Sequence, residues 1–317
     1  MPQQCARLGH LLDVQKVAGS NPARPTALSL FGKREPALRE KPSIDWGAFR
    51  RWVKSKYAKS YAATVYCYAK KFSGLLDGGN WAELECFSRS KRGAILRALS
   101  ALSRYLGVHQ LFKQRMKDYG LKWESQSSFE SFLRIINKNK DDVVEWVKQC
   151  LKGFDDTYIV FVKFALFTGI RKGEAIEAFN LIVRLGRVGR LSGYYNAELE
   201  TLEHFRYPEK FIRGTKNVFF SFVPKTFVDE VAKCHTISAS SYKRRIMKLG
   251  MHSRIKDLRE YFATYMLNHG LLKEEIDLIQ GRIGKSLFMK HYFSPAIKDV
   301  KNRTLNAVQM LSETLAA

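Results

Sequence analysis

The chain has 317 residues, of which 54 are Lys or Arg and 30 are Asp or Glu, so its formal net charge is +24. A positive excess of this size predicts attraction to a polyanion, with nucleic acid ahead of a ribosomal or membrane-surface association. No apolar run reaches the roughly 18 residues that a membrane span needs, and the five scattered cysteines exclude a disulfide framework or a zinc site. We therefore expect an intracellular, cytoplasmic and nucleoid-associated protein, without metal, cofactor, membrane or small-molecule substrate.

Residues 1–40 have little periodicity, and Pro22, Pro25 and Pro36 interrupt any long helix. The segment is expected to be a flexible leader. Its peptide VAGSNPARP (17–25) can be written in codons that contain GGTTCGAATCC, which resembles the TΨC arm of a tRNA gene. Codon degeneracy allows many other spellings of the same peptide, and this one predicts that a tRNA-like attachment site encodes part of the leader.

Residues 41–120 are expected to form a helical domain, because apolar positions recur every three or four residues. Its outer faces are rich in Lys and Arg. Such faces are usually only solvated, but acidic residues are scarce here, which favours binding to the DNA backbone. The residues expected to contact DNA are Arg50, Arg51, Lys54, Lys59, Lys70, Lys71, Arg92 and Arg97.

Residues 121–130 have the polar composition of a linker, and residues 131–295 are expected to form a second domain. An apolar helix is predicted over 155–168, followed by a turn at Gly169 and a new helix from Arg171. Glu174 in the first turn of that helix is favourable for its dipole.

Residues 181–224 depart from the helical pattern. Aromatic and β-branched residues at 210–213 and 218–223 flank the turn GTKN (214–217), which predicts a β-hairpin with Lys216 at its tip. A lone lysine in a turn is usually only solvated. Helices are predicted to resume at about 225, and the final helix occupies 296–317.

The final helix has an apolar stripe, and the sequence leaves open whether it packs in cis or on a neighbouring protomer. The residues of the stripe are Val300, Val308, Leu311 and Leu315, with Leu305 at its edge.

Four segments in order resemble the tyrosine recombinases, or phage-integrase family. They are TGIRKGE (168–174), KDLREYFAT (256–264), IQGR (279–282) and KHYF (290–293). The family has a TG-x-R-x-x-E box, an H-x-L-R-H-x-F-A-T box, an L-G-H or L-G-W box, and a tyrosine nine or ten residues later. Each motif alone is weak, but the ordered set is specific and covers about residues 41–295.

The resemblance implies a mainly α fold with a small β-sheet or hairpin, divided into a helical core-binding domain and a mixed α/β catalytic domain. It also implies double-stranded DNA as substrate and a tetramer on paired sites. The catalytic residues that match the motifs are Arg171, Lys216, Lys256, Arg259, Arg282 and Tyr292, with Glu174 in support.

The chemistry of these side chains suits phosphoryl transfer. Guanidinium forks bind two phosphate oxygens at once, so Arg171 and Arg259 are expected to clamp the scissile phosphate while Tyr292 attacks. Lys216 is expected to protonate the leaving 5′-oxygen, with Arg213 as the alternative acid.

Two positions depart from the usual motifs, since Lys256 and Arg282 replace histidine or tryptophan. These replacements resemble the archaeal spindle-shaped-virus integrases, in which the attachment site lies inside the integrase gene and overlaps a tRNA gene. A type IB topoisomerase-like enzyme and a DNA-binding relative without catalysis remain as alternatives. The general base is left open, and the nearby Tyr261 and Tyr265 are expected to be packing residues.

Overall fold

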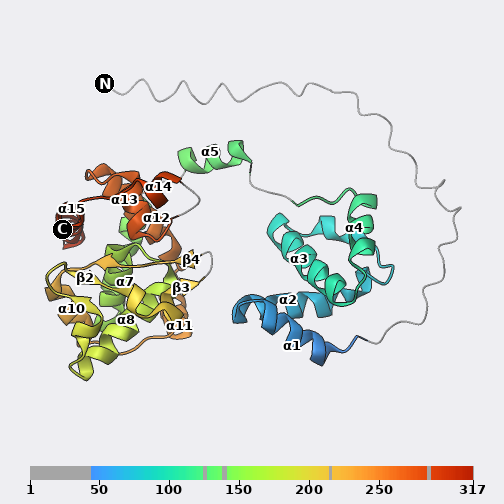
Figure 1. The fold of residues 1–317 in the computed structure, drawn as a ribbon, viewed down its shortest axis with the longest axis horizontal. Helices are drawn as coiled ribbons and strands as arrows, with labels where there is room; N and C mark the ends of the chain where they lie inside the picture. The colour runs from blue at the N-terminus through green and yellow to red at the C-terminus, as the bar shows by residue number, and fades with distance from the viewer. Residues whose placement is uncertain (1–43, 124–126, 138–140, 214–215, 284–286, 317) are drawn as a thin grey trace, which may run out of the picture. The chain divides into compact units, whose positions relative to one another are not determined.

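The structure is a computed structural model that describes residues 44–123, 127–137, 141–213, 216–283 and 287–316. The predicted leader lies outside this part of the chain, as do residues 124–126 of the predicted linker. The chain forms two compact units, with the border between Ser127 and Ser128 (Figure 1).

Over its described residues, unit 1 consists of helices and the loops that connect them. Its α-helices are α1 (Trp46–Lys56), α2 (Lys59–Phe72), α3 (Arg89–Tyr105) and α4 (His109–Asp118), with short 3₁₀ helices η1 (Ser73–Leu75) and η2 (Trp81–Cys86). The core forms where α1, α2 and α3 meet, and Trp81 lies fully buried in it while its indole donates to the Leu75 carbonyl. This unit can therefore bury its own apolar faces.

Unit 2 combines helices with two small sheets. Its first α-helices are α5 (Ser128–Asn137), α6 (Asp141–Gly153), α7 (Asp156–Thr168), α8 (Lys172–Arg187) and α9 (Pro208–Phe211). The later ones are α10 (Lys225–Ala232), α11 (Ala239–Lys248), α12 (Ile255–Asn268), α13 (Lys273–Ile279), α14 (Leu287–His291) and α15 (Ile297–Ala316). The strands are β1 (Tyr195–Asn196), β2 (Thr201–Leu202), β3 (Ile212–Arg213), β4 (Lys216–Asn217) and β5 (Ser221–Phe222), and the 3₁₀ helices are η3 (Leu191–Gly193) and η4 (His204–Arg206).

The core of unit 2 is built around α7, which is apolar on nearly all sides and buried along most of its length. A helix of this kind needs cover on several faces. α12, α6 and α10 contact it, and α10 also packs along α8 (Figure 1). Because the described strands are short, the fold is mainly α with a small antiparallel sheet, as the sequence predicts.

The larger sheet is antiparallel, with strand order β1-β2-β5. Beside it, the buried imidazole of His204 makes hydrogen bonds with the Tyr194 hydroxyl at 2.6 Å and the Ser221 hydroxyl at 2.9 Å. Burial lowers the pKa of His204 to about 3, because the charged imidazolium is disfavoured away from water. This polar group therefore stays neutral and fixes the sheet to the segment that precedes it.

The hairpin is present but shorter than predicted. β3 pairs with β4 so that Arg213 faces Lys216, which places Lys216 in a strand and not at the tip. Residues 210 and 211 belong to α9, whose first residue is Pro208, a favoured start for a helix. Residues 221 and 222 pair with β2 instead.

The boundaries of two other predicted segments also differ. α5 begins at Ser128, so the last three residues of the predicted linker are helical. α8 continues to Arg187 because its residues Leu181, Ile182 and Val183 are buried in the core. Gly186 permits a close approach there, since a Cβ on it would lie 2.7 Å from the Cβ of Ala232.

The C-terminal helix α15 packs in cis in this structure. All four residues of the predicted stripe are buried in the unit 2 core, and Leu305 packs at its edge. Arg303 on α15 also binds the buried carboxylate of Glu275 with both terminal nitrogens, at 2.9 and 2.5 Å. This helix is thus part of the core of unit 2.

Candidate active site

Arg171 stands at the junction between α7 and α8. α7 ends at Gly169, whose φ of 58° lies in the left-handed region that favours glycine. A Cβ on residue 169 would lie 2.3 Å from the ring of Phe262 on α12. The turn therefore packs directly on α12 and brings Arg171, the N-cap residue of α8, close to that helix.

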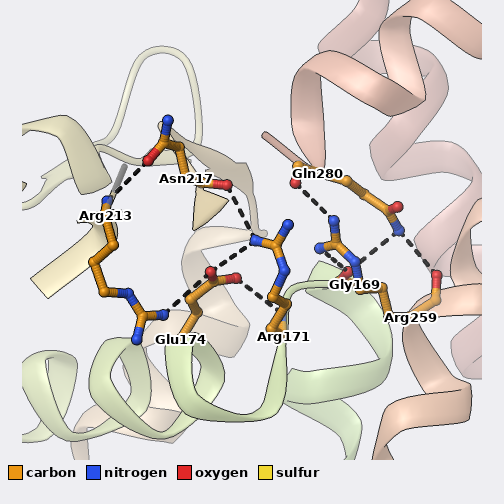
Figure 2. A network of polar contacts seen from close by, with 7 residues as sticks. All are labelled: Gly169, Arg171, Glu174, Arg213, Asn217, Arg259 and Gln280. Carbon is orange, nitrogen blue, oxygen red and sulfur yellow. Dashed lines mark hydrogen bonds and ion pairs between the residues drawn. The ribbon is translucent and has the colours of Figure 1, made fainter. Parts of the chain in front are cut away.

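Glu174 is a buried carboxylate that binds Arg171 twice (Figure 2). Its Oε1 accepts from Arg171 Nη1 at 2.8 Å, and its Oε2 accepts from the Arg171 backbone N–H at 3.0 Å. Arg213 on β3 donates to the same Oε1 at 3.4 Å. Since a buried carboxylate is stable only when it is paired, Glu174 orients Arg171 and draws the hairpin towards α8.

Arg259 on α12 is held by main-chain oxygens (Figure 2). Its Nη1 donates to the Gly169 carbonyl at 3.1 Å and its Nη2 to the Gln280 carbonyl at 2.8 Å. Burial lowers the pKa of Arg259 to about 10, with the nearby guanidinium groups of Arg171 and Arg282 acting in the same direction. The structure thus concentrates positive charge at a partly desolvated position, which is a property of anion-binding sites.

A pocket of about 560 Å³ lies over these residues. Among the described residues, the basic side chains that line it are Arg134, Arg171, Lys172, Lys256, Arg259 and Arg282. Glu260 also lines it, 3.9 Å from Arg134. The pocket therefore brings together four of the six predicted catalytic residues, which come from α8, α12 and the segment after α13.

Arg282 is half-exposed, and its Nη1 lies 3.6 Å from a carboxylate oxygen of Asp277. Lys256 lies exposed in the first turn of α12. Both side chains can therefore reach an anion in the pocket.

The segment that carries Arg282 touches the hairpin at Gly281. This glycine has a φ of 65°, and a Cβ on it would lie 1.9 Å from the Asn217 carbonyl oxygen on β4. The same oxygen accepts a hydrogen bond from Arg171 Nη1 at 3.3 Å. The backbone of β4 is therefore fixed next to the pocket, although the side chain of Lys216 lies outside the described part of the structure.

Tyr292 follows α14 and is 75% exposed. Its backbone N–H donates to the Phe288 carbonyl at 2.9 Å. It is not among the described residues that line the pocket, and residues 284–286, which connect α14 to Arg282, lie outside the described ranges. The structure thus presents the tyrosine to solvent and does not bring it together with the arginines.

The competing tyrosines have packing roles. Tyr261 and Tyr265 are half-buried, stack on each other at 5.8 Å between ring centroids, and pack against the core of unit 2.

Sequence reasoning missed several residues around the pocket. Gln280 and Asn217 contribute main-chain oxygens to the two arginines, and Arg134 and Lys172 add charge. Asn217 is next to Lys216 and Gln280 is two residues before Arg282, but nothing in residue type signals a backbone acceptor. Only their place in the fold reveals them.

The predicted DNA-contacting residues of unit 1 are on its outer surface. Arg50, Arg51 and Lys54 are exposed on α1. Lys70, Lys71 and Arg97 are exposed on α2 and α3, and Arg92 is half-exposed. The side chain of Lys59 lies outside the described part. These positions leave the basic side chains accessible to a polyanion.

Two other features are absent from the described residues. No group of three or more His, Cys, Asp or Glu side chains is arranged there to hold a metal ion. No helix in the described ranges is long and apolar enough to cross a membrane.

The described cysteines are free thiols. Cys67 and Cys86 are exposed, and Cys150 and Cys234 are buried.

Comparison with known proteins agrees with the arrangement of the motifs. No curated protein matches the chain. An integrase from mycobacterium phage Brujita has a structure with 15% sequence identity and a TM-score of 0.35, covering 84% of this chain and 93% of its own. That likeness is too slight to support a conclusion. The family model described as archaeal phage integrase matches residues 135–303, which is more than half of the chain. The chain therefore belongs to the archaeal phage integrase family and is a DNA recombinase.

Proposed function

We propose that the protein is a site-specific tyrosine recombinase that cleaves and rejoins DNA through a 3′-phosphotyrosyl intermediate. One observation carries the proposal. Four basic residues, far apart in the sequence and matched to the family motifs, line one pocket in which burial and neighbouring cations lower the pKa of Arg259. A phosphodiester is the anion that fits both this charge and the family.

In the proposed reaction, the Tyr292 oxygen attacks the phosphorus, its phenolic proton is released, and the bond from phosphorus to the 5′-oxygen breaks. Negative charge grows on the non-bridging oxygens, where the forks of Arg171 and Arg259 bind it. Loss of one such preorganised donor typically slows a reaction by roughly 100- to 1000-fold. Glu174 binds the guanidinium of Arg171, and two main-chain oxygens bind that of Arg259. Neither guanidinium therefore needs to reorganise when the phosphate binds.

The leaving 5′-oxygen needs a proton, which we assign to Lys216 on β4. The close contact of Asn217 with Gly281 supports this assignment, because it holds the backbone of β4 beside Arg282. Lys256 and Arg282 donate hydrogen bonds to the phosphate, and the base that takes the phenolic proton of Tyr292 is left unassigned. The phosphotyrosyl ester conserves the bond energy, so a 5′-hydroxyl reverses the step without a cofactor.

For this chemistry, the side chain of Tyr292 must move into the pocket. Because it is exposed in the structure, it is accessible for that movement. We further propose that the enzyme acts as a tetramer on paired sites and integrates a mobile element at a tRNA gene. The tRNA-like spelling that codon degeneracy allows for residues 17–25 supports the choice of target.

A nicked suicide substrate tests the proposal, because a cleaved strand that loses its 5′-end cannot be religated. The wild-type protein is expected to form a covalent protein–DNA adduct on cognate DNA. Tyr292→Phe is expected to abolish the adduct while DNA binding persists. Absence of an adduct from the wild type would favour a DNA-binding relative without catalysis.

A second measurement separates the recombinase from a topoisomerase-like enzyme. A recombinase requires paired target sequences, whereas a nicking–closing enzyme relaxes supercoiled DNA without defined sites. Sequencing the DNA trapped on Tyr292 then tests the tRNA-gene target.

A further inference from the structure

Gln280 links all the parts that hold Arg259. It follows α13, and its side chain is fully buried. Its Nε2 donates to the Gly169 carbonyl at 3.2 Å and to the Arg259 carbonyl at 2.9 Å. Its own carbonyl accepts from Arg259 Nη2 at 2.8 Å (Figure 2). One residue thus binds Arg259 at both its backbone and its guanidinium.

These hydrogen bonds form a closed ring. The Gly169 carbonyl accepts from both the Gln280 amide and Arg259 Nη1, so the amide fixes the oxygen that orients the guanidinium. The turn after α7, helix α12 and the end of α13 are tied together at this point. A guanidinium held by two fixed acceptors is restricted in its plane, and its other N–H groups keep a constant direction.

Folding stability alone does not explain the side-chain amide of Gln280. Among the described residues, the Gln280 Oε1 has no hydrogen-bond partner although it is buried. A buried acceptor of this kind is costly to the folded state. The hydrogen bonds from Nε2 offset that cost, so an apolar side chain of similar size would give a protein of comparable stability. An apolar side chain such as leucine could not donate the two hydrogen bonds from Nε2 to the Gly169 and Arg259 carbonyls, which complete the ring.

We propose that Gln280 is a positioning residue for DNA cleavage, which acts by holding the Arg259 guanidinium against one non-bridging oxygen of the scissile phosphate. The inference rests on the proposed tyrosine chemistry. It assigns to Gln280 no contact with DNA, so its effect is on the rate of cleavage and not on the affinity for the site.

The test compares full-length wild-type protein with Gln280→Leu, and with Gln280→Met as a second apolar variant with an unbranched side chain. Asn180→Leu is the matched control. Asn180 is also a bridging amide in unit 2, since it donates to the Ile237 carbonyl and accepts from the Ile237 N–H, both at 2.8 Å. It does not line the pocket, over the residues described.

Three quantities are measured: single-turnover cleavage of the suicide substrate, the Kd for the same DNA, and the melting temperature. A fourth measurement uses substrates in which sulfur replaces one or the other non-bridging oxygen of the scissile phosphate. Sulfur is a poor acceptor, so a fixed Arg259 makes the two diastereomers react at different rates. The ratio of those rates reports the placement of the guanidinium, which a general loss of stability does not change.

Gln280→Leu is expected to slow cleavage roughly 10- to 100-fold, as a small misplacement of a catalytic group does. The Kd is expected to stay unchanged and the diastereomer ratio to move towards one. Asn180→Leu is expected to lower the melting temperature and keep the ratio. If neither apolar variant changes the ratio, or if the rate falls only in proportion to DNA binding, Gln280 is not a positioning residue. If the wild type itself forms no Tyr292 adduct, the proposed function fails first and is recognised separately.

Discussion

The backbone of Gly281 touches the Asn217 carbonyl so closely that a Cβ on residue 281 would lie 1.9 Å from that oxygen. Asn217 is next to Lys216, and Gly281 is next to Arg282. The contact therefore joins the hairpin to the segment that follows α13, and it places two proposed catalytic residues on adjacent backbones.

Gly281→Ala is expected to separate these two segments. The substitution adds a collision to the strain of a φ of 65°, and the strain alone costs about 1–3 kcal/mol of folding free energy. Cleavage of the suicide substrate is expected to fall by about 100-fold, because the displaced groups no longer meet at the phosphate.

Gly189→Ala is the control for this experiment. Its φ of 67° gives a similar backbone strain, but no atom lies within 4 Å of the added Cβ. It is expected to lose stability and keep its cleavage rate per folded molecule. An equal loss of cleavage in both variants would show that backbone strain, and not the close approach to Asn217, explains the result.

Glu174→Gln is expected to impair cleavage through Arg171. The substitution keeps the size of the side chain but removes the buried charge that pairs with Arg171 and Arg213. Since charge-assisted hydrogen bonds are about twice as strong as neutral ones, we expect a loss of about 1–3 kcal/mol of unfolding free energy and a slower cleavage step. Urea denaturation and single-turnover cleavage measure the two effects.

Glu177→Gln on the same helix is the matched control. Glu177 is half-exposed and 4.0 Å from Lys210, so its ion pair is expected to contribute less than about 1 kcal/mol. A similar drop in cleavage for both variants would argue against a specific role for Glu174.

Lys216→Ala tests the assignment of the general acid. We expect slow cleavage of ordinary DNA and recovery with a 5′-phosphorothiolate, whose sulfur leaves without needing a proton. Arg213→Ala is compared on the same two substrates. Recovery for Arg213→Ala and not for Lys216→Ala would transfer the role to Arg213.

Unit 1 is expected to contribute salt-sensitive binding to the DNA backbone. Replacement of Arg50, Arg51 and Lys54 by glutamine is expected to reduce the slope of log Kd against log salt by about 0.9 for each phosphate that the protein no longer neutralises. Replacement of Arg50 and Arg51 by lysine keeps the charge and is expected to keep the slope. Fluorescence anisotropy at several salt concentrations measures both, and an unchanged slope in the glutamine variant would show that other residues bind the backbone.

The buried imidazole of His204 is expected to make folding sensitive to acid. Its pKa is about 3 in the folded state and near 6.5 when unfolded, so below pH 6.5 the unfolded state binds a proton that the folded state does not. The contribution of His204 to the free energy of unfolding is therefore fully present above pH 6.5. As the pH is lowered below 6.5, the free energy of unfolding decreases by up to about 1.4 kcal/mol per pH unit. Urea denaturation between pH 7.5 and 5 is expected to show a shallower pH dependence in His204→Gln. Parallel curves for the two proteins would contradict this account.

The helices and the arginines could be predicted from the sequence because both depend on local signals. The continuous apolar run of α7, the glycine after it and the basic motif residues are all visible in the chain. The short strands were harder, because Phe211 lies in α9, which begins at Pro208, although its aromatic and β-branched neighbours predict a strand. The oxygens around Arg259 could not be predicted at all, since every residue has a carbonyl and only the fold selects which ones face a guanidinium.

The burial of α15 means that codons 297–316 encode core structure. A premature stop codon just after Tyr292 would keep every proposed catalytic residue in the chain. It would also remove the five apolar side chains that α15 buries and the arginine that pairs with Glu275. Such a product would expose a large apolar surface to proteases and aggregation, so a nonsense change between Tyr292 and α15 would inactivate the enzyme as effectively as changes in the motifs themselves.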